Sequence, residues 1–104
     1  GRMPGMVQAG TYSAVLHYLK AIAAAGNADG KPVAAKLREL KVDDFFPKGF
    51  VREDGRMVHD MLLVEVKKPD ESKGAWDYYK VLSTIAANDA VQPLDQSKCA
   101  LVKK

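Results

Sequence analysis

The stretch that decides the fold is TYSAVLHYLKAIAAA, which occupies residues 11–25. Apolar side chains recur there three or four positions apart, as on one face of an α-helix, at Tyr12, Val15, Leu19, Ile22 and Ala23. Ser13, His17 and Lys20 fall on the opposite side, where we expect a polar, water-facing surface. The pattern therefore predicts an amphipathic helix with an unusually wide apolar face.

Local signals mark the ends of this helix and the start of a second one. The hydroxyl of Thr11 can cap the first backbone N–H groups, and Gly26 can adopt the left-handed conformation that ends a helix. Pro32 suits the first position of a helix, so a second helix is predicted over residues 32–41. Because the connection is short, we expect the two helices to be neighbours.

Beyond the second helix, the hydrophobic repeat shortens to two residues, as in β-strands. The Asp-Gly dipeptide at residues 54–55 is a strong hairpin signal, and strands are predicted within residues 50–67 and 78–85. Between residues 61 and 66 apolar side chains occur on both faces, so both faces of this strand require cover. Residues 86–104 are predicted to form an irregular tail.

Too little chain is present to cover all of this apolar surface. Residues 1–104 suit one domain, and taken alone they predict an α+β unit of two helices and a small, mainly antiparallel sheet. The wide apolar face of the first helix and the two-sided strand need more partners than such a unit supplies. We therefore expect part of a larger body, or a chain that completes its core by association.

Composition excludes several classes of protein. The chain has 104 residues, 47% of them hydrophobic, with 16 Lys+Arg against 13 Asp+Glu and a net charge of +3. These values are typical of globular domains, and no apolar run is long enough to span a bilayer. The beginning of the chain lacks the apolar region of a signal peptide. Basic residues form no stripe with interleaved aromatics, so we expect no nucleic-acid binding.

Catalytic and metal-binding patterns are also missing from the sequence. His59 and Asp60 are adjacent on a predicted strand, so their side chains point to opposite faces and cannot act as a pair. No spacing of ligands suits zinc or calcium, and no phosphate-binding loop occurs. We expect no enzyme, no metal and no cofactor. Cys99 is predicted to be a free thiol or to have lost a disulfide partner.

A binding role is easier to support, at the approach to the first helix. Residues 6–12 form a predicted loop of small and flexible residues before the positive end of the helix dipole, where backbone N–H groups can hold a carboxylate. The alternative is structural: Met6 and Val7 pack on the helix as a hydrophobic staple, and Gly10 eases the turn.

Three segments resemble the substrate-binding proteins of ABC transporters of the branched-chain amino acid type, the extracellular ligand-binding receptors with the type 1 periplasmic binding fold. MVQAGTYSAVLHYLKA at residues 6–21 resembles their late helix, and REDGRMVHDMLLVEVKKP at 52–69 their crossover region. ESKGAWDYYK at 71–80 is similar to the following stretch in a subgroup associated with aromatic and other organic acids. The resemblance covers nearly the whole chain, but only the C-terminal part of such proteins.

This resemblance implies a function and a set of site residues. Family members have two α/β lobes joined by three crossing segments, trap a small solute as the lobes close, and deliver it in the periplasm to a membrane permease without catalysis. The implied solute is an amino acid or an aromatic or organic carboxylate. The segment before the late helix can line the cleft in this family, so the implied ligand-binding residues are Met6, Gln8, Ala9, Gly10 and Tyr12.

Two other functions remain open at this stage. The same fold serves as a ligand-sensing module in regulatory proteins, and a small basic domain could bind nucleic acid on its own. For a transporter component or a sensor of this fold, the resemblance explains why apolar surface is left over, since this chain would be a fragment of a doubly wound lobe. Alone, such a fragment would form a homo-oligomer or a dimer that swaps elements.

Overall fold

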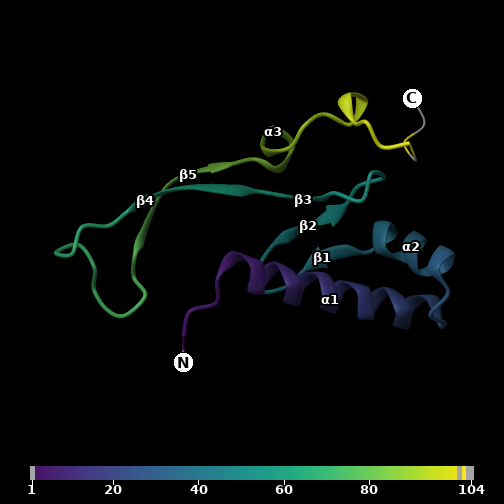
Figure 1. The fold of residues 1–104 in the computed structure, drawn as a ribbon, viewed down its shortest axis with the longest axis horizontal. Helices are drawn as coiled ribbons and strands as arrows, with labels where there is room; N and C mark the ends of the chain where they lie inside the picture. The colour runs from purple at the N-terminus through teal and green to yellow at the C-terminus, as the bar shows by residue number, and fades with distance from the viewer. Residues whose placement is uncertain (1, 101, 103–104) are drawn as a thin grey trace.

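A computed structural model describes residues 2–100 and 102 as an elongated body with extents of 52 × 34 × 17 Å. Two helices, α1 (Met6–Ala25) and α2 (Gly30–Glu39), pack against each other and border a small sheet (Figure 1). A two-stranded ribbon extends away from them, and the C-terminal segment runs back along the sheet. This is the α+β arrangement expected from the sequence. Among the described residues, no helix is long and apolar enough to cross a membrane.

The first helix begins five residues earlier than predicted, at Met6 rather than Thr11. Gly5 is its N-cap in an extended conformation, and the Gly5 N–H donates to Oε1 of Gln8 over 2.6 Å. Gly10 therefore lies inside the helix, where glycine costs about 1 kcal/mol relative to alanine without breaking it. The predicted end is confirmed: Gly26 has a φ of 70° and donates to the carbonyl of Ile22.

The buried face of α1 is the opposite of the predicted one. Every fourth residue is buried along a stripe of small and polar side chains, formed by Ala9, Ser13, His17 and Ala21. Val15 and Leu19 are 52% and 55% exposed. The expectation that Ser13 and His17 face water is therefore wrong. The reason is that α1 has neighbours on one side only within the described chain, and small residues allow the close approach there.

Two hydrogen bonds satisfy the polar groups on this buried stripe. The Oγ of Ser13 donates to Oδ2 of Asp44 over 2.7 Å, and Nε2 of His17 lies 2.9 Å from the carbonyl oxygen of Leu37 in α2. Asp44 also accepts from the N–H of Phe46, so its carboxylate fastens the corner after the first strand to α1. Buried polar groups that are paired in this way make the helix packing specific.

The second helix is displaced by two residues from its predicted span of 32–41. It starts at Gly30 after the N-cap Asp29 and ends at Glu39. Its predicted last residue, Lys41, instead begins strand β1 (Lys41–Asp43), which pairs antiparallel with β2 (Lys48–Val51). Backbone pairing in the sheet overrides the helical pattern at this end.

The three-stranded sheet has the order β1-β2-β3 and contains the predicted hairpin, whose second strand is β3 (Met57–His59). Gly55 in the Asp-Gly turn has a φ of 81°, which glycine adopts without strain. Gly49 is required for a different reason: a Cβ there would lie 2.1 Å from the carbonyl oxygen of Val58. Val42 and Val58 are the buried apolar centre of this sheet.

The ribbon consists of β4 (Met61–Val66) and β5 (Tyr79–Ile85), paired antiparallel from Met61 opposite Ile85 to Val66 opposite Tyr79. These strands agree with the predicted segments to within one residue at β5. Every residue of both strands is exposed, although most of the side chains are apolar. The ribbon therefore presents two uncovered apolar faces, as the sequence pattern required.

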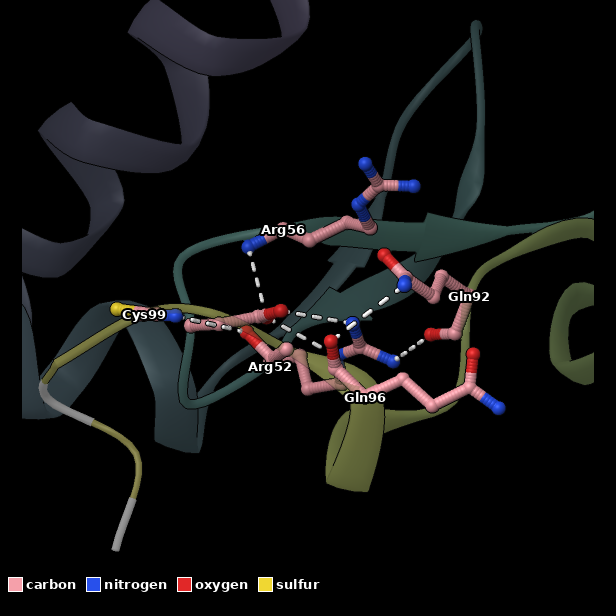
Figure 2. Close-up of polar contacts among 7 residues, drawn as sticks. Arg52, Arg56, Gln92, Gln96 and Cys99 are labelled. Carbon is pink, nitrogen blue, oxygen red and sulfur yellow. Dashed lines mark hydrogen bonds and ion pairs between the residues drawn. The ribbon is translucent and has the colours of Figure 1, made fainter.

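The predicted irregular tail contains two short helical turns, α3 (Ala87–Ala90) and η1 (Leu94–Gln96). A polar cluster attaches this segment to the β2–β3 turn (Figure 2). Arg52 donates through Nε and Nη2 to both carboxylate oxygens of Asp54, at 2.9 and 2.7 Å, and through Nη1 to the carbonyl of Gln92. The donation from Arg52 holds the pKa of Asp54 well below its usual range. Residues 101 and 103–104 lie outside the described tail.

Candidate functional site

A cavity of about 670 Å³ lies where the start of α1 meets the junction between the sheet and the ribbon. Four segments that are distant in the sequence contribute to its wall: the first turns of α1, the corner before β2, the β3–β4 junction and β5. The wall is formed by Met6, Gly10, Phe46, Pro47, Lys48, His59, Asp60, Met61, Leu62 and Thr84. Apolar and aromatic side chains with a few polar groups are the usual lining of a small-molecule site.

The structure brings two of the five sequence-predicted site residues, Met6 and Gly10, into this wall. Gln8 instead turns back and accepts the N–H of Gly5. Ala9 is buried in the stripe of small and polar residues on α1. Tyr12 is 54% exposed and its ring stacks edge-on against Phe45, with 5.0 Å between centroids. Contact of these five residues with a ligand stays a prediction.

Because α1 starts earlier than predicted, the backbone N–H groups that could bind an anion also lie earlier in the chain than predicted. Within α1 the first N–H with a helical acceptor is that of Ala9, which donates to the carbonyl of Gly5 over 3.1 Å. The N–H groups of Met6, Val7 and Gln8 precede it and have no acceptor inside the helix. No acidic residue occupies the first turn. The positive end of the helix dipole is therefore not neutralised by its own sequence.

Four polar side chains in the wall were missed by sequence reasoning: Lys48, His59, Asp60 and Thr84. The Nδ1 of His59 lies 2.7 Å from the backbone oxygen of Asp60, and Oδ1 of Asp60 accepts the N–H of Ala87 over 2.8 Å. The two side chains thus have separate partners, but the expectation that they point to opposite faces of one strand is wrong, because Asp60 lies between β3 and β4 and both residues line this wall. The one signal in the sequence was the alternation of side-chain direction along a strand, which could have indicated that His59, at the strand end, faces a cavity.

A second cavity of about 410 Å³ adjoins the first along α1 and shares four of its residues: Gly10, Phe46, Pro47 and His59. Its wall extends along the buried stripe to Ser13 and His17. His59 is the one polar side chain among the four shared residues, and its ring lies 6.0 Å from that of Phe46. The rings of Phe46 and His59 therefore lie where the two cavities adjoin.

Within the described residues, no group of three or more histidine, cysteine or acidic side chains could hold a metal ion. Cys99 is half-buried, and its N–H donates to the Oγ of Ser97 over 3.3 Å.

Comparison with protein families and solved structures identifies similar proteins. A family model described as periplasmic binding protein matches residues 1–75. The crystal structure of a periplasmic binding protein from Burkholderia mallei is 52% identical over 98% of this chain, with a TM-score of 0.93. A branched chain amino acid ABC transporter periplasmic ligand-binding protein from Burkholderia xenovorans LB400 is 49% identical over 97% of this chain, with a TM-score of 0.91.

These similarities cover only part of each solved protein. This chain spans 27% of the length of both structures. Comparison with curated proteins found no match. These similarities confirm the expected resemblance to periplasmic binding proteins, whereas the association of residues 71–80 with a subgroup for aromatic and other organic acids stays a prediction.

Proposed function

We propose a function from the premise that this chain belongs to the periplasmic binding protein family. The protein captures a small solute, an amino acid or an aromatic or organic carboxylate, and delivers it in the periplasm to the permease of an ABC transporter. Its role is reversible binding rather than catalysis.

The observation that carries this proposal is the 670 Å³ cavity at the start of α1. Free N–H groups at a helix start favour an anion, and no acidic residue in the first turn competes for them. Phe46, Met61 and Leu62 supply an apolar wall for the remainder of the solute. A carboxylate with an apolar body matches both halves of this lining, with Met6, Gln8, Ala9, Gly10 and Tyr12 as the predicted ligand-binding set.

The uncovered surfaces support placement within a longer, two-lobed protein. The outer face of α1 and both faces of the ribbon are apolar and exposed, and the chain spans 27% of its solved relatives. In our proposal the remaining part of the protein covers them. The chain then passes between lobes at Asp60 and Ala86, where the sheet ends and the ribbon begins. Closure about such a junction would enclose a solute held at the start of α1.

Calorimetric titration of the complete protein with L-leucine and with benzoate tests this function. These two probes share a carboxylate and an apolar body, and they differ in the ammonium group. Saturable binding of either probe supports the proposal and assigns the solute class. If neither probe nor a wider panel of amino and aromatic acids binds, the proposed capture of carboxylates is wrong.

A further inference from the structure

The side chain of His59 occupies a distinctive place in the proposed site. It ends β3 opposite Gly49 of β2, and it lines both adjoining cavities. The close approach at Gly49, where a Cβ would lie 3.1 Å from the Cβ of His59, keeps the two strands tightly packed. The backbone that carries His59 is therefore held firmly at the cavity wall.

The hydrogen bond made by His59 defines which ring nitrogen carries a proton. Its Nδ1 lies 2.7 Å from the backbone oxygen of Asp60, and a carbonyl oxygen can only accept. Nδ1 is therefore the protonated nitrogen of the neutral ring. Nε2 has no hydrogen-bond partner among residues 2–100 and 102. It is an acceptor when the ring is neutral and a donor when the ring is cationic.

Two other charged side chains, Asp60 and Lys48, share this wall with His59, and a second histidine, His17, lines the adjoining cavity. Asp60 precedes β4 and its Oδ1 already accepts the Ala87 N–H. Lys48 of β2 is 84% exposed at its side chain, with Nζ 3.8 Å from Oδ1 of Asp43.

We propose that Nε2 of His59, in the cationic ring, donates to the carboxylate of the captured solute. This inference rests on the proposed function and adds a pH-dependent contact to it. A carboxylate favours the charged form of a neighbouring imidazole, so binding takes up a fraction of a proton near neutral pH. Affinity must then rise as the pH falls, because the cationic ring becomes more populated before the solute is bound.

Calorimetric titration of the complete protein with benzoate, at about pH 5.5 and about pH 8, tests the proposal. The expected dissociation constant is about tenfold lower at the acidic value. Titration near neutral pH in two buffers of different ionisation enthalpy should show proton uptake. The variant His59→Gln should bind benzoate with no such pH dependence and no uptake. The variant Lys48→Met is the control, because it removes a permanent charge and should change affinity equally at both pH values.

The outcomes separate this inference from the proposed function. Benzoate or L-leucine binding that is the same at both pH values, without proton uptake, overturns the role of His59 and leaves solute capture standing. A pH dependence that persists in His59→Gln also overturns it. Absence of binding by both probes and by the wider panel at both pH values overturns the proposed capture of carboxylates, and the role of His59 with it.

Discussion

The Nε2 of His17 lies 2.9 Å from the carbonyl oxygen of Leu37, a hydrogen bond that joins α1 to α2 across their interface. His17 is 5% exposed, so this polar contact replaces the apolar one that the helical pattern indicated. The small residues above and below it, Ser13 and Ala21, let the helices approach closely enough for the bond to form. This hydrogen bond is therefore a specific polar contact within the pairing of the two helices.

Replacement of the His17 imidazole should destabilise the protein. His17→Leu keeps an apolar bulk but leaves the carbonyl of Leu37 without its partner, which costs about 1–3 kcal/mol when such a group is buried. Urea unfolding followed by circular dichroism measures the change. Lys20→Leu, at an exposed position of the same helix, should stay within about 0.5 kcal/mol of the parent. Equal stabilities of the two variants would show that the hydrogen bond contributes nothing.

Loss of the arginine that attaches the C-terminal segment should release that segment. In Arg52→Ala, the carbonyl of Gln92 loses its Arg52 donor and the carboxylate of Asp54 loses both guanidinium donations, so residues 92–99 should exchange their amide hydrogens faster. Hydrogen–deuterium exchange read by mass spectrometry gives this directly. Arg56→Ala is the matched control, because Arg56 contributes its backbone N–H to Asp54. Acceleration to the same degree in both variants, or in α1 as well, would count against a local attachment.

Filling the cavity from α1 should weaken capture of the solute. A Cβ on Gly10 meets no atom within 4 Å, so Gly10→Val projects into open space at the cavity wall without disturbing the helix. Overlap with a bound solute should raise the dissociation constant for L-leucine or benzoate about tenfold or more. Gly30→Val, also at a helical glycine with open space around it, should leave binding unchanged. Unaltered affinity in Gly10→Val would remove Gly10 from the site.

The chain of residues 1–104, taken alone, should associate through its uncovered faces. Val15 and Leu19 on α1 are half exposed, and the ribbon is apolar on both sides. Sedimentation velocity should show the average mass rising with concentration. The double variant Val15→Glu with Leu19→Glu should shift the chain toward monomer, whereas Lys20→Glu on the polar edge of the same helix should not. A monomer at every concentration would contradict the expectation.

Local signals in the sequence account for much of the fold. Gly26 ends α1 and the Asp-Gly pair at 54–55 turns the hairpin as predicted, because both depend on backbone conformations that glycine adopts cheaply. The start of α1 was misplaced because Gly10 and Thr11 imitate a helix boundary, while the effective cap is Gly5 with Gln8. Such a choice between two caps depends on small differences in free energy.

Features that depend on tertiary contact could not be read from the pattern. Which side of α1 is buried follows from the neighbours present, and these pack on the stripe of small and polar residues rather than on the apolar face. The candidate cavity joins Gly10, Lys48, His59 and Thr84 from four separate segments, and no spacing along the chain predicts that they meet. Family resemblance pointed to the start of α1, whereas the opposite wall is formed only by the folding of three other segments against it.

The hydrogen bond from Ala87 to the carboxylate of Asp60 closes the base of the β4–β5 ribbon. It joins the residue before β4 to a residue just after β5, at the level where both strands leave the sheet. The segment that enters the ribbon before β4 is thereby linked to the segment that leaves it after β5. We expect the two strands of the ribbon to move together relative to the sheet, because this bond links both of their connections to it.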